Sequence, residues 1–148
     1  MVPLYERDLA EEFSNAIKYP LFVPNNVAEA GWPDRFVQLP QSRIVAVELK
    51  VVTLTRVNTF NLANFRQTQA AWMAKWQRNG GLGFLFVGIN SKTEFVGYYA
   101  MTKAKWIDWL YVNKMTYNLN DVLWFRQQKN ITFWFEDFIA VETTRQEA

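Results

Sequence analysis

The sequence contains no cysteine and no histidine. Without cysteine there are no disulfides, thiolate zinc sites or cysteine nucleophiles, which is compatible with a reducing compartment. Without histidine the commonest general base is missing, together with the usual zinc and copper ligand and every Ser-His-Asp or Cys-His scheme. Any catalysis must therefore use Asp, Glu, Lys, Tyr or a hard cation held by oxygen atoms, which favours magnesium or manganese.

Long apolar runs are also missing, although half of the 148 residues are hydrophobic and 17% are aromatic. No run approaches the roughly 18 residues that signal a membrane span. The first residues are polar and acidic, whereas a signal peptide is basic and then apolar. We therefore expect an intracellular protein with no membrane partner, and the length suits a single domain over residues 1–148. The net charge of +2 permits nucleic-acid binding without requiring it.

Apolar periodicity predicts an α/β chain of the α+β type. A hairpin of two strands and a long helix that ends at Gly80-Gly81 are followed by an apolar run typical of a strand covered on both faces. Because a strand, a helix and a buried strand form a crossover unit, we expect the strands on either side of the helix to be parallel. The predicted core elements are a helix at 3–19, a loop at 20–33, strands at 35–39 and 44–52, a helix at 61–79, and strands at 82–89 and 94–101.

Residues 102–148 are predicted to form a helical and strand extension of this core, which itself covers about residues 3–101. Short Trp-rich helices are expected at residues 102–112 and 119–128, and a closing strand at residues 131–141. Aromatic side chains at this spacing are more typical of a core or a dimer interface than of base stacking.

Three charges lie in segments that otherwise read as buried strands: Asp34, Glu48 and Lys50. Side chains of a strand alternate between its faces, so Glu48 and Lys50 lie side by side on one face. An unpaired buried charge is costly, and a metal ion with a phosphate would supply the missing partner. Carboxylates that hold magnesium, beside a lysine that stabilises charge or orients and deprotonates a water, are a standard solution for phosphodiester hydrolysis.

Pro33-Asp34 followed by Glu48-Leu49-Lys50 resembles the motif of the PD-(D/E)xK nuclease superfamily. The resemblance implies a restriction-endonuclease-like core, a mixed sheet flanked by helices in the order αβββαβ. It also implies that Asp34, Glu48 and the backbone carbonyl of Leu49 bind Mg²⁺, with Mn²⁺ as a substitute, and that Lys50 assists the water.

Many members of this superfamily add a glutamate from the first helix, and Glu6 is the candidate here. Glu6 shares the spacing of Leu9, Phe13 and Ile17, so it is expected to face inward. The alternative is that Glu6 only complements the helix dipole from the first turn.

A narrower resemblance covers residues 29–90. The run at residues 60–65, with Gln69, Met73 and Gly80-Gly81 after it, is similar to the Holliday junction resolvases of Gram-positive bacteria. The Gly-x-Pro-Asp opening is similar to the VRR-NUC nucleases. In both groups a glutamine on the helix after the motif strand reaches the active site, which here implies Gln69, with Gln67 as the alternative. Residues 102–148 resemble neither group.

We therefore expect a Mg²⁺-dependent endodeoxyribonuclease, structure-specific for branched DNA such as Holliday junctions and acting as a homodimer. The expected phosphate-binding cations are Arg35, Arg56 and Arg66. One alternative is a flap-type or sequence-specific nuclease of the same superfamily. Another is a non-catalytic nuclease-fold module that binds nucleic acid. A compact chain of this kind also fits a bacteriophage source.

Overall fold

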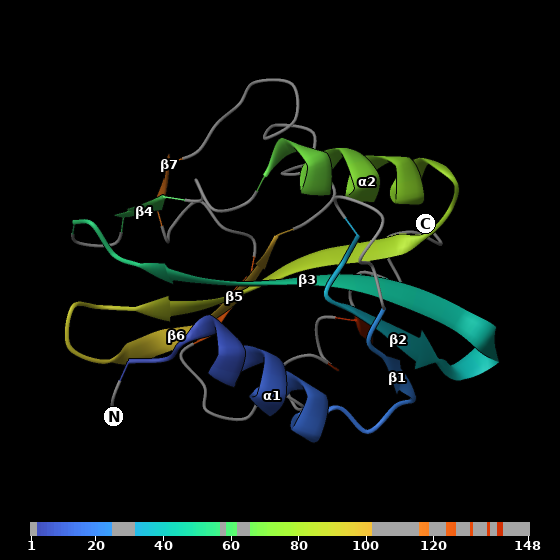
Figure 1. Ribbon diagram of the computed structural model, residues 1–148, viewed down its shortest axis with the longest axis horizontal. Helices are drawn as coiled ribbons and strands as arrows, with labels where there is room; N and C mark the ends of the chain where they lie inside the picture. Colours follow the sequence, from blue (N-terminus) through green and yellow to red (C-terminus); the bar gives the residue numbers. More distant parts are fainter. Residues whose placement is uncertain are drawn as a thin grey trace.

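The computed structural model describes residues 3–24, 32–56, 59–61, 66–101, 116–118 and 124–126, with residues 131, 136 and 139–140. Within these residues, six strands form one mixed sheet in the order β1-β2-β3-β5-β6-β8, and β4 pairs with β7 (Figure 1). The elements are α1 (Glu6–Ala16), β1 (Leu21–Phe22), β2 (Arg35–Leu39), the 3-10 turn η1 (Pro40–Ser42), β3 (Arg43–Thr53), β4 (Thr59–Asn61), α2 (Gln67–Arg78), β5 (Leu82–Asn90), β6 (Phe95–Met101), β7 (Thr116–Asn118) and β8 (Trp124–Arg126).

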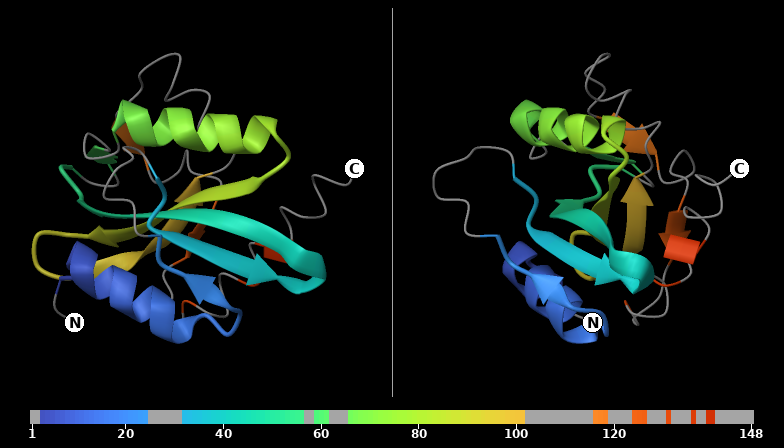
Figure 2. Two further views of the ribbon diagram at one scale, coloured as in Figure 1. Left: turned by 45° about the vertical axis from the view of Figure 1, so that its right-hand side comes forward. Right: turned by 90° about the vertical axis from the view of Figure 1, so that its right-hand side faces the viewer.

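The two helices cover opposite faces of the sheet, which gives three layers (Figures 1 and 2). On the α1 face, Phe13 packs edge-on against Phe86 of β5 with ring centroids 5.3 Å apart. On the α2 face, Ala70 and Met73 pack against Ala46 of β3. Burying one large apolar side chain contributes about 1.5–3 kcal/mol, so the faces of both helices that contact the sheet fix their positions on it.

The parallel pairing of β3 and β5 is the centre of the sheet. It runs from Val45 opposite Leu82 to Thr53 opposite Asn90, and every residue of β5 is buried. The helix α2 makes the crossover between these strands, as the sequence predicts. The predicted antiparallel hairpin of β2 and β3 is also present. The predicted α+β class and mixed sheet are therefore confirmed.

Helix and strand boundaries differ from the predictions where partners are distant in sequence. The helix predicted for residues 61–79 begins only at Gln67, and Asn61 belongs to β4, which pairs with β7. The loop predicted for residues 20–33 includes β1, which pairs with β2. Local periodicity does not reveal such pairings, because the hydrogen bonds come from a partner strand elsewhere in the sequence.

Two predictions for the extension are wrong. The segment predicted as a helix at residues 119–128 contains β8, which extends the sheet beyond β6. The segment predicted as a strand at residues 131–141 is helical at its four described positions. Short aromatic runs fit either structure, and only the neighbouring sheet edge decides between them. The helix predicted for residues 102–112 lies outside the described residues. In the described part of the chain, no helix is both long and apolar enough to cross a membrane.

Candidate active site

The two halves of the motif meet where β2 begins beside the middle of β3. Antiparallel pairing places Arg35 opposite Val47, so Asp34, immediately before β2, lies next to the Glu48–Lys50 segment. The backbone N–H of Leu49 donates a 2.8 Å hydrogen bond to Oδ2 of Asp34. The hairpin register therefore holds the first carboxylate against the backbone that carries the second.

Glu48 and Lys50 are buried side by side on the α2 face, with 1% and 5% of their surface exposed. Nζ of Lys50 lies 3.7 Å from Oε1 of Glu48. The side-chain amide of Gln69 donates a 3.0 Å hydrogen bond to the same oxygen. Oε2 of Glu48 is buried and has no hydrogen-bond partner among the described residues. The site thus contains a carboxylate oxygen for which the described residues supply no hydrogen-bond donor.

Burial, and after it the negative charge of Asp34, raise the pKa of Glu48 from 4.5 to about 10 in total. The ammonium of Lys50 lowers this pKa and does not cancel the other effects. Desolvation and a neighbouring like charge both disfavour the ionised form of a carboxyl group. Without a further cation, Glu48 is therefore protonated at neutral pH.

Gln69 connects the start of α2 to the site. Its side-chain oxygen accepts a 3.0 Å hydrogen bond from the backbone N–H of Arg66, the residue that caps the helix. Because this bond occupies the oxygen, the NH₂ group of Gln69 points toward Glu48. Gln67, the alternative candidate from the sequence, is exposed in the first turn. Of the two glutamines, Gln69 is the one brought to the carboxylates.

Glu6 is exposed at the start of α1, so the expectation that it faces inward is wrong. Its charge nevertheless contributes a small increase to the pKa of Glu48, which places it near the site. Across the described residues, no group of three or more potential Asp, Glu, His or Cys ligands is close enough to hold a metal ion. Leu9 and Phe13 of the same helix are buried as expected, whereas Glu6 lies in the first turn of α1 and is exposed.

The three arginines expected to bind DNA lie in different settings. Arg35 donates to Oγ of Ser14 at 3.0 Å and to the carbonyl of Asp34 at 2.7 Å. Its guanidinium therefore ties α1 to the backbone of the first carboxylate. Arg56 and Arg66 are exposed, after β3 and before α2 respectively.

An aromatic cluster next to the site was not anticipated from the sequence. It comprises Trp32, Phe36, Trp72 and Trp76, whose neighbouring ring centroids are 5.3–6.2 Å apart. The available signals were the position of Trp32 two residues before Asp34 and the four-residue spacing of the two tryptophans on α2. Below, the aromatic cluster refers to these four residues.

Comparison with known protein families identifies the family of this chain. The family model of Recombination protein U matches residues 40–139. The matched region includes Glu48, Lys50 and Gln69, and it reaches well into the extension that by sequence resembled nothing. Comparison with curated proteins gave no match. The chain belongs to the Recombination protein U family, and is thus a Holliday junction resolvase-like nuclease of DNA recombination with a restriction-endonuclease-like fold.

Proposed function

We propose that the protein is a Mg²⁺-dependent endonuclease of the PD-(D/E)xK type that cuts branched DNA. The observation that carries this proposal is the buried oxygen of Glu48 that has no hydrogen-bond partner among the described residues, in a site where Asp34, Lys50 and Gln69 converge. A buried acceptor without a partner is costly. A buried acceptor of this kind is retained where a bound ligand supplies the missing partner.

The donor set fits a hard divalent cation. The pKa of Glu48 is raised to about 10 by burial and by Asp34, so a bound cation is what would return this carboxyl to its ionised form. Asp34, Glu48 and the backbone carbonyl of Leu49 would hold Mg²⁺ or Mn²⁺, and water would fill the remaining positions. Glu6 would act through such a water, since it is exposed. When bound, the ion supplies an activated water and neutralises charge at the phosphate.

Lys50 and Gln69 have distinct roles in this proposal. The ammonium of Lys50, 3.7 Å from Glu48, is placed to stabilise negative charge that develops on the phosphate, or to orient and deprotonate the attacking water. Gln69 does not act on the phosphate. Its 3.0 Å hydrogen bond fixes the orientation of the Glu48 carboxylate, so it is a positioning residue.

The distribution of charge supports binding of DNA on the α2 face. Between Arg35 and Thr93 the sequence contains a single carboxylate, Glu48, among several lysines and arginines. The helix α2 has Lys75 and Arg78 in its last turn and no acid in its first, whereas α1 begins with Glu6 and Asp8. A polyanion is attracted to the first surface and repelled by the second. Glu48, Lys50 and the nearby Arg66 all belong to the basic side.

The branched substrate and the homodimer belong to the same proposal. A two-fold dimer places two identical sites on opposite strands, which suits symmetric cutting of a four-way junction. Membership of the Recombination protein U family favours this substrate over a flap or a linear duplex.

A cleavage assay tests the function. Purified protein with Mg²⁺ is expected to cut a four-way junction, and to leave a linear duplex of the same sequence largely intact. EDTA should abolish cutting and Mn²⁺ should restore it. If a flap is cut in preference to the junction, the substrate is a flap and not a junction. If junction, flap and duplex all stay intact over a range of Mg²⁺ concentrations, the proposed function is wrong.

Gln69→Ala is expected to lower the cleavage rate roughly 10- to 100-fold, the usual effect of losing a residue that orients a metal ligand. Gln67→Ala is the matched control, because Gln67 lies in the same helical turn and is exposed. Single-turnover cleavage of the junction measures both variants. Gln69→Ala should also raise the Mg²⁺ concentration needed for half-maximal rate, which a merely structural effect on α2 would not do. Equal rates for the two variants would remove Gln69 from the site.

A further inference from the structure

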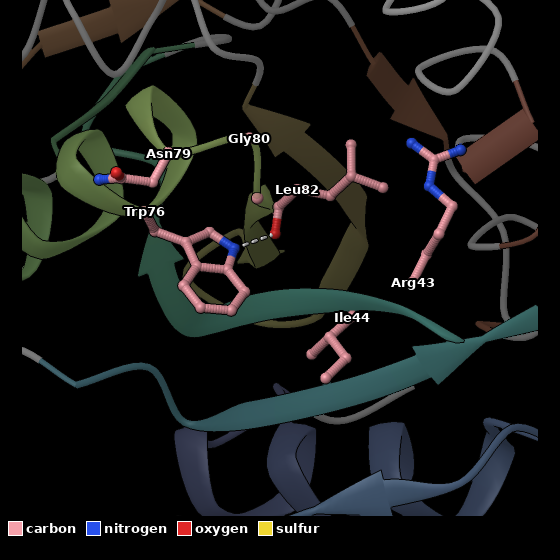
Figure 3. Close-up of a pocket in the computed structure, with 7 residues that line it drawn as sticks. Arg43, Ile44, Trp76, Asn79, Gly80 and Leu82 are labelled. Atoms are coloured by element: carbon pink, nitrogen blue, oxygen red, sulfur yellow. Dashed lines mark hydrogen bonds between the residues drawn. The ribbon is translucent and has the colours of Figure 1, made fainter. Parts of the chain in front are cut away.

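A pocket of about 350 Å³ lies at the far end of α2 from Gln69, where β3 and β5 begin. In the view of Figure 3, Trp76 and Arg43 stand on opposite sides of this pocket, with Ile44 and Leu82 between them. Below, the pocket refers to the cavity lined by Arg43, Ile44, Trp76, Asn79, Gly80, Gly81 and Leu82.

The indole of Trp76 forms a fixed flat wall. Its Nε1–H donates a 2.7 Å hydrogen bond to the carbonyl of Leu82, drawn in Figure 3. The ring stacks on Trp72 with centroids 5.3 Å apart and an angle of 18° between the planes. A Cβ at position 81 would overlap the indole, so glycine is required there for the ring to occupy this place. The wall is therefore rigid before any ligand arrives.

The pocket is connected to the candidate active site along one face of the sheet. Ile44 and Glu48 both point to the α2 side of β3, because residues two apart in a strand share a face. Four residues of strand separate them by about 13 Å, a distance that a few nucleotides span. The aromatic cluster lies between, since Phe36 is opposite Ala46 and contacts both Trp72 and Trp76.

The charge around the pocket suits a phosphate. Arg43 lines it, and Lys75 and Arg78 occupy the adjoining last turn of α2. The carbonyls at the end of a helix are normally a negative pole. Here the carbonyls of residues 75–77 already accept backbone hydrogen bonds from residues 79–81. The pocket thus combines an aromatic wall and cations, and no carboxylate is among the described residues that line it.

We propose that the pocket binds one unpaired nucleotide of the DNA substrate, with its base against Trp76 and its phosphate toward Arg43. This proposal rests on the proposed function and adds that a four-way junction, whose bases are all paired, must open one base pair near the branch point for the nucleotide to enter the pocket. A volume of about 350 Å³ is at the small end of ligand sites, which suits a single nucleotide. A paired base is stacked within its duplex and cannot reach the wall, so the pocket favours DNA with unpaired bases over a continuous duplex.

Binding without divalent metal tests this proposal separately from cleavage. The probe is a duplex with one unpaired 2-aminopurine, compared with the same duplex fully paired. The full chain in EDTA is expected to bind the bulged duplex about tenfold more tightly, since stacking one base on an aromatic ring typically gives a gain of this order. The fluorescence of 2-aminopurine should be quenched on binding. Equal affinity for the two duplexes, or unchanged fluorescence, would overturn the proposal.

Ile44→Glu places a carboxylate in the pocket and is expected to abolish the tenfold preference. Ile44 is 42% exposed, so the substitution should not unfold the chain, which circular dichroism checks. Val23→Glu is the matched control, because Val23 is exposed and does not line the pocket. For each variant, the ratio of its affinities for the bulged and the paired duplex is compared, because the new charge repels both duplexes equally.

Each combination of results has a distinct meaning. If the wild type cuts junctions but lacks the preference for the bulge, the pocket is not a nucleotide site and the proposed function stands. If the preference is present and no DNA is cut, the pocket proposal stands and the proposed function is wrong. If Ile44→Glu keeps the preference, or only converts a dimer to a monomer by sedimentation, the surface is not a nucleotide site.

Discussion

Lys50→Met should lower the single-turnover rate of junction cleavage by about a thousandfold, the usual effect of losing a charge-stabilising or proton-transferring group. Methionine keeps most of the volume of a side chain that is only 5% exposed, so packing against its neighbours is retained. Removing the ammonium eliminates the one cation that lies 3.7 Å from Glu48 among the described residues. Binding of the junction should be largely unchanged, because exposed cations provide most of the phosphate contacts.

Lys18→Met is the control for this variant, because it removes one exposed lysine that follows α1. It should cut at the wild-type rate. Binding is compared by gel shift in Ca²⁺, and cleavage by quenched-flow or manual sampling in Mg²⁺. A cleavage rate for Lys50→Met within a few-fold of wild type would exclude Lys50 from the chemistry.

Glu48→Gln is expected to abolish cleavage and, at the same time, to stabilise the metal-free protein. The amide cannot replace a carboxylate as a metal ligand of comparable strength. It also removes the cost of a buried acid that is forced to stay protonated. We expect the free energy of unfolding in EDTA to rise by roughly 1–3 kcal/mol at pH 8. Urea denaturation measures this difference.

The pH dependence of the stability difference has a definite sign. In the unfolded chain a glutamate has a pKa of 4.5, whereas the pKa of Glu48 in the folded protein is about 10. Below pH 4.5 both states hold the proton, and the group contributes no difference. At a pH between these two pKa values, only the unfolded state has lost the proton of Glu48. The stability of the metal-free wild type therefore falls progressively as the pH rises through this range. The advantage of Glu48→Gln should therefore widen from pH 5 to pH 9.

Magnesium should reverse this pattern. A ligand that binds only the folded state stabilises it, so Mg²⁺ is expected to raise the melting temperature of the wild type and not that of Glu48→Gln. Glu11→Gln, which neutralises an exposed carboxylate on α1, should behave as the wild type. A variant Glu48→Gln that is less stable than wild type at every pH would contradict the proposal, because Glu48 would then be an ionised structural partner of Lys50.

Most of the core was predictable because its signals are local. The unbroken apolar run of β5 and the alternation along β3 identify buried strands, and Gly80-Gly81 ends α2 as expected. A helix between two such strands implies their parallel pairing. The extension was not predictable, since Trp124–Arg126 becomes a strand only through its pairing with β6. The aromatic residues of the extension fit a helix equally well, and only pairing with the β6 edge of the sheet makes residues 124–126 a strand.

The candidate site was predictable in its residues and less so in its connections. Charges within buried strands pointed to Asp34, Glu48 and Lys50, and the family resemblance implied Gln69, with Gln67 as the alternative. The hairpin and the crossover bring Asp34, Glu48, Lys50 and Gln69 together. Glu6 shows the limit of this reasoning, because periodicity assigns a face to a helix position but does not show how much of that face the neighbouring segments cover. The contacts of Arg35 with Ser14 and with the carbonyl of Asp34 were likewise invisible, since they join residues of three segments.

The sequence by itself led to the proposed kind of chemistry. Without histidine and cysteine, two carboxylates and a lysine in buried strands leave oxygen-bound metal catalysis as the main route. Only the tertiary structure decided how these groups are held. It sets the hydrogen bond that Asp34 accepts from the backbone of Leu49 and places the pocket beside Trp76 on the same face. It also leaves one oxygen of Glu48 without a partner within the part of the chain that the structure describes. These features depend on desolvation and on strand register, which arise only when segments distant in sequence pack together.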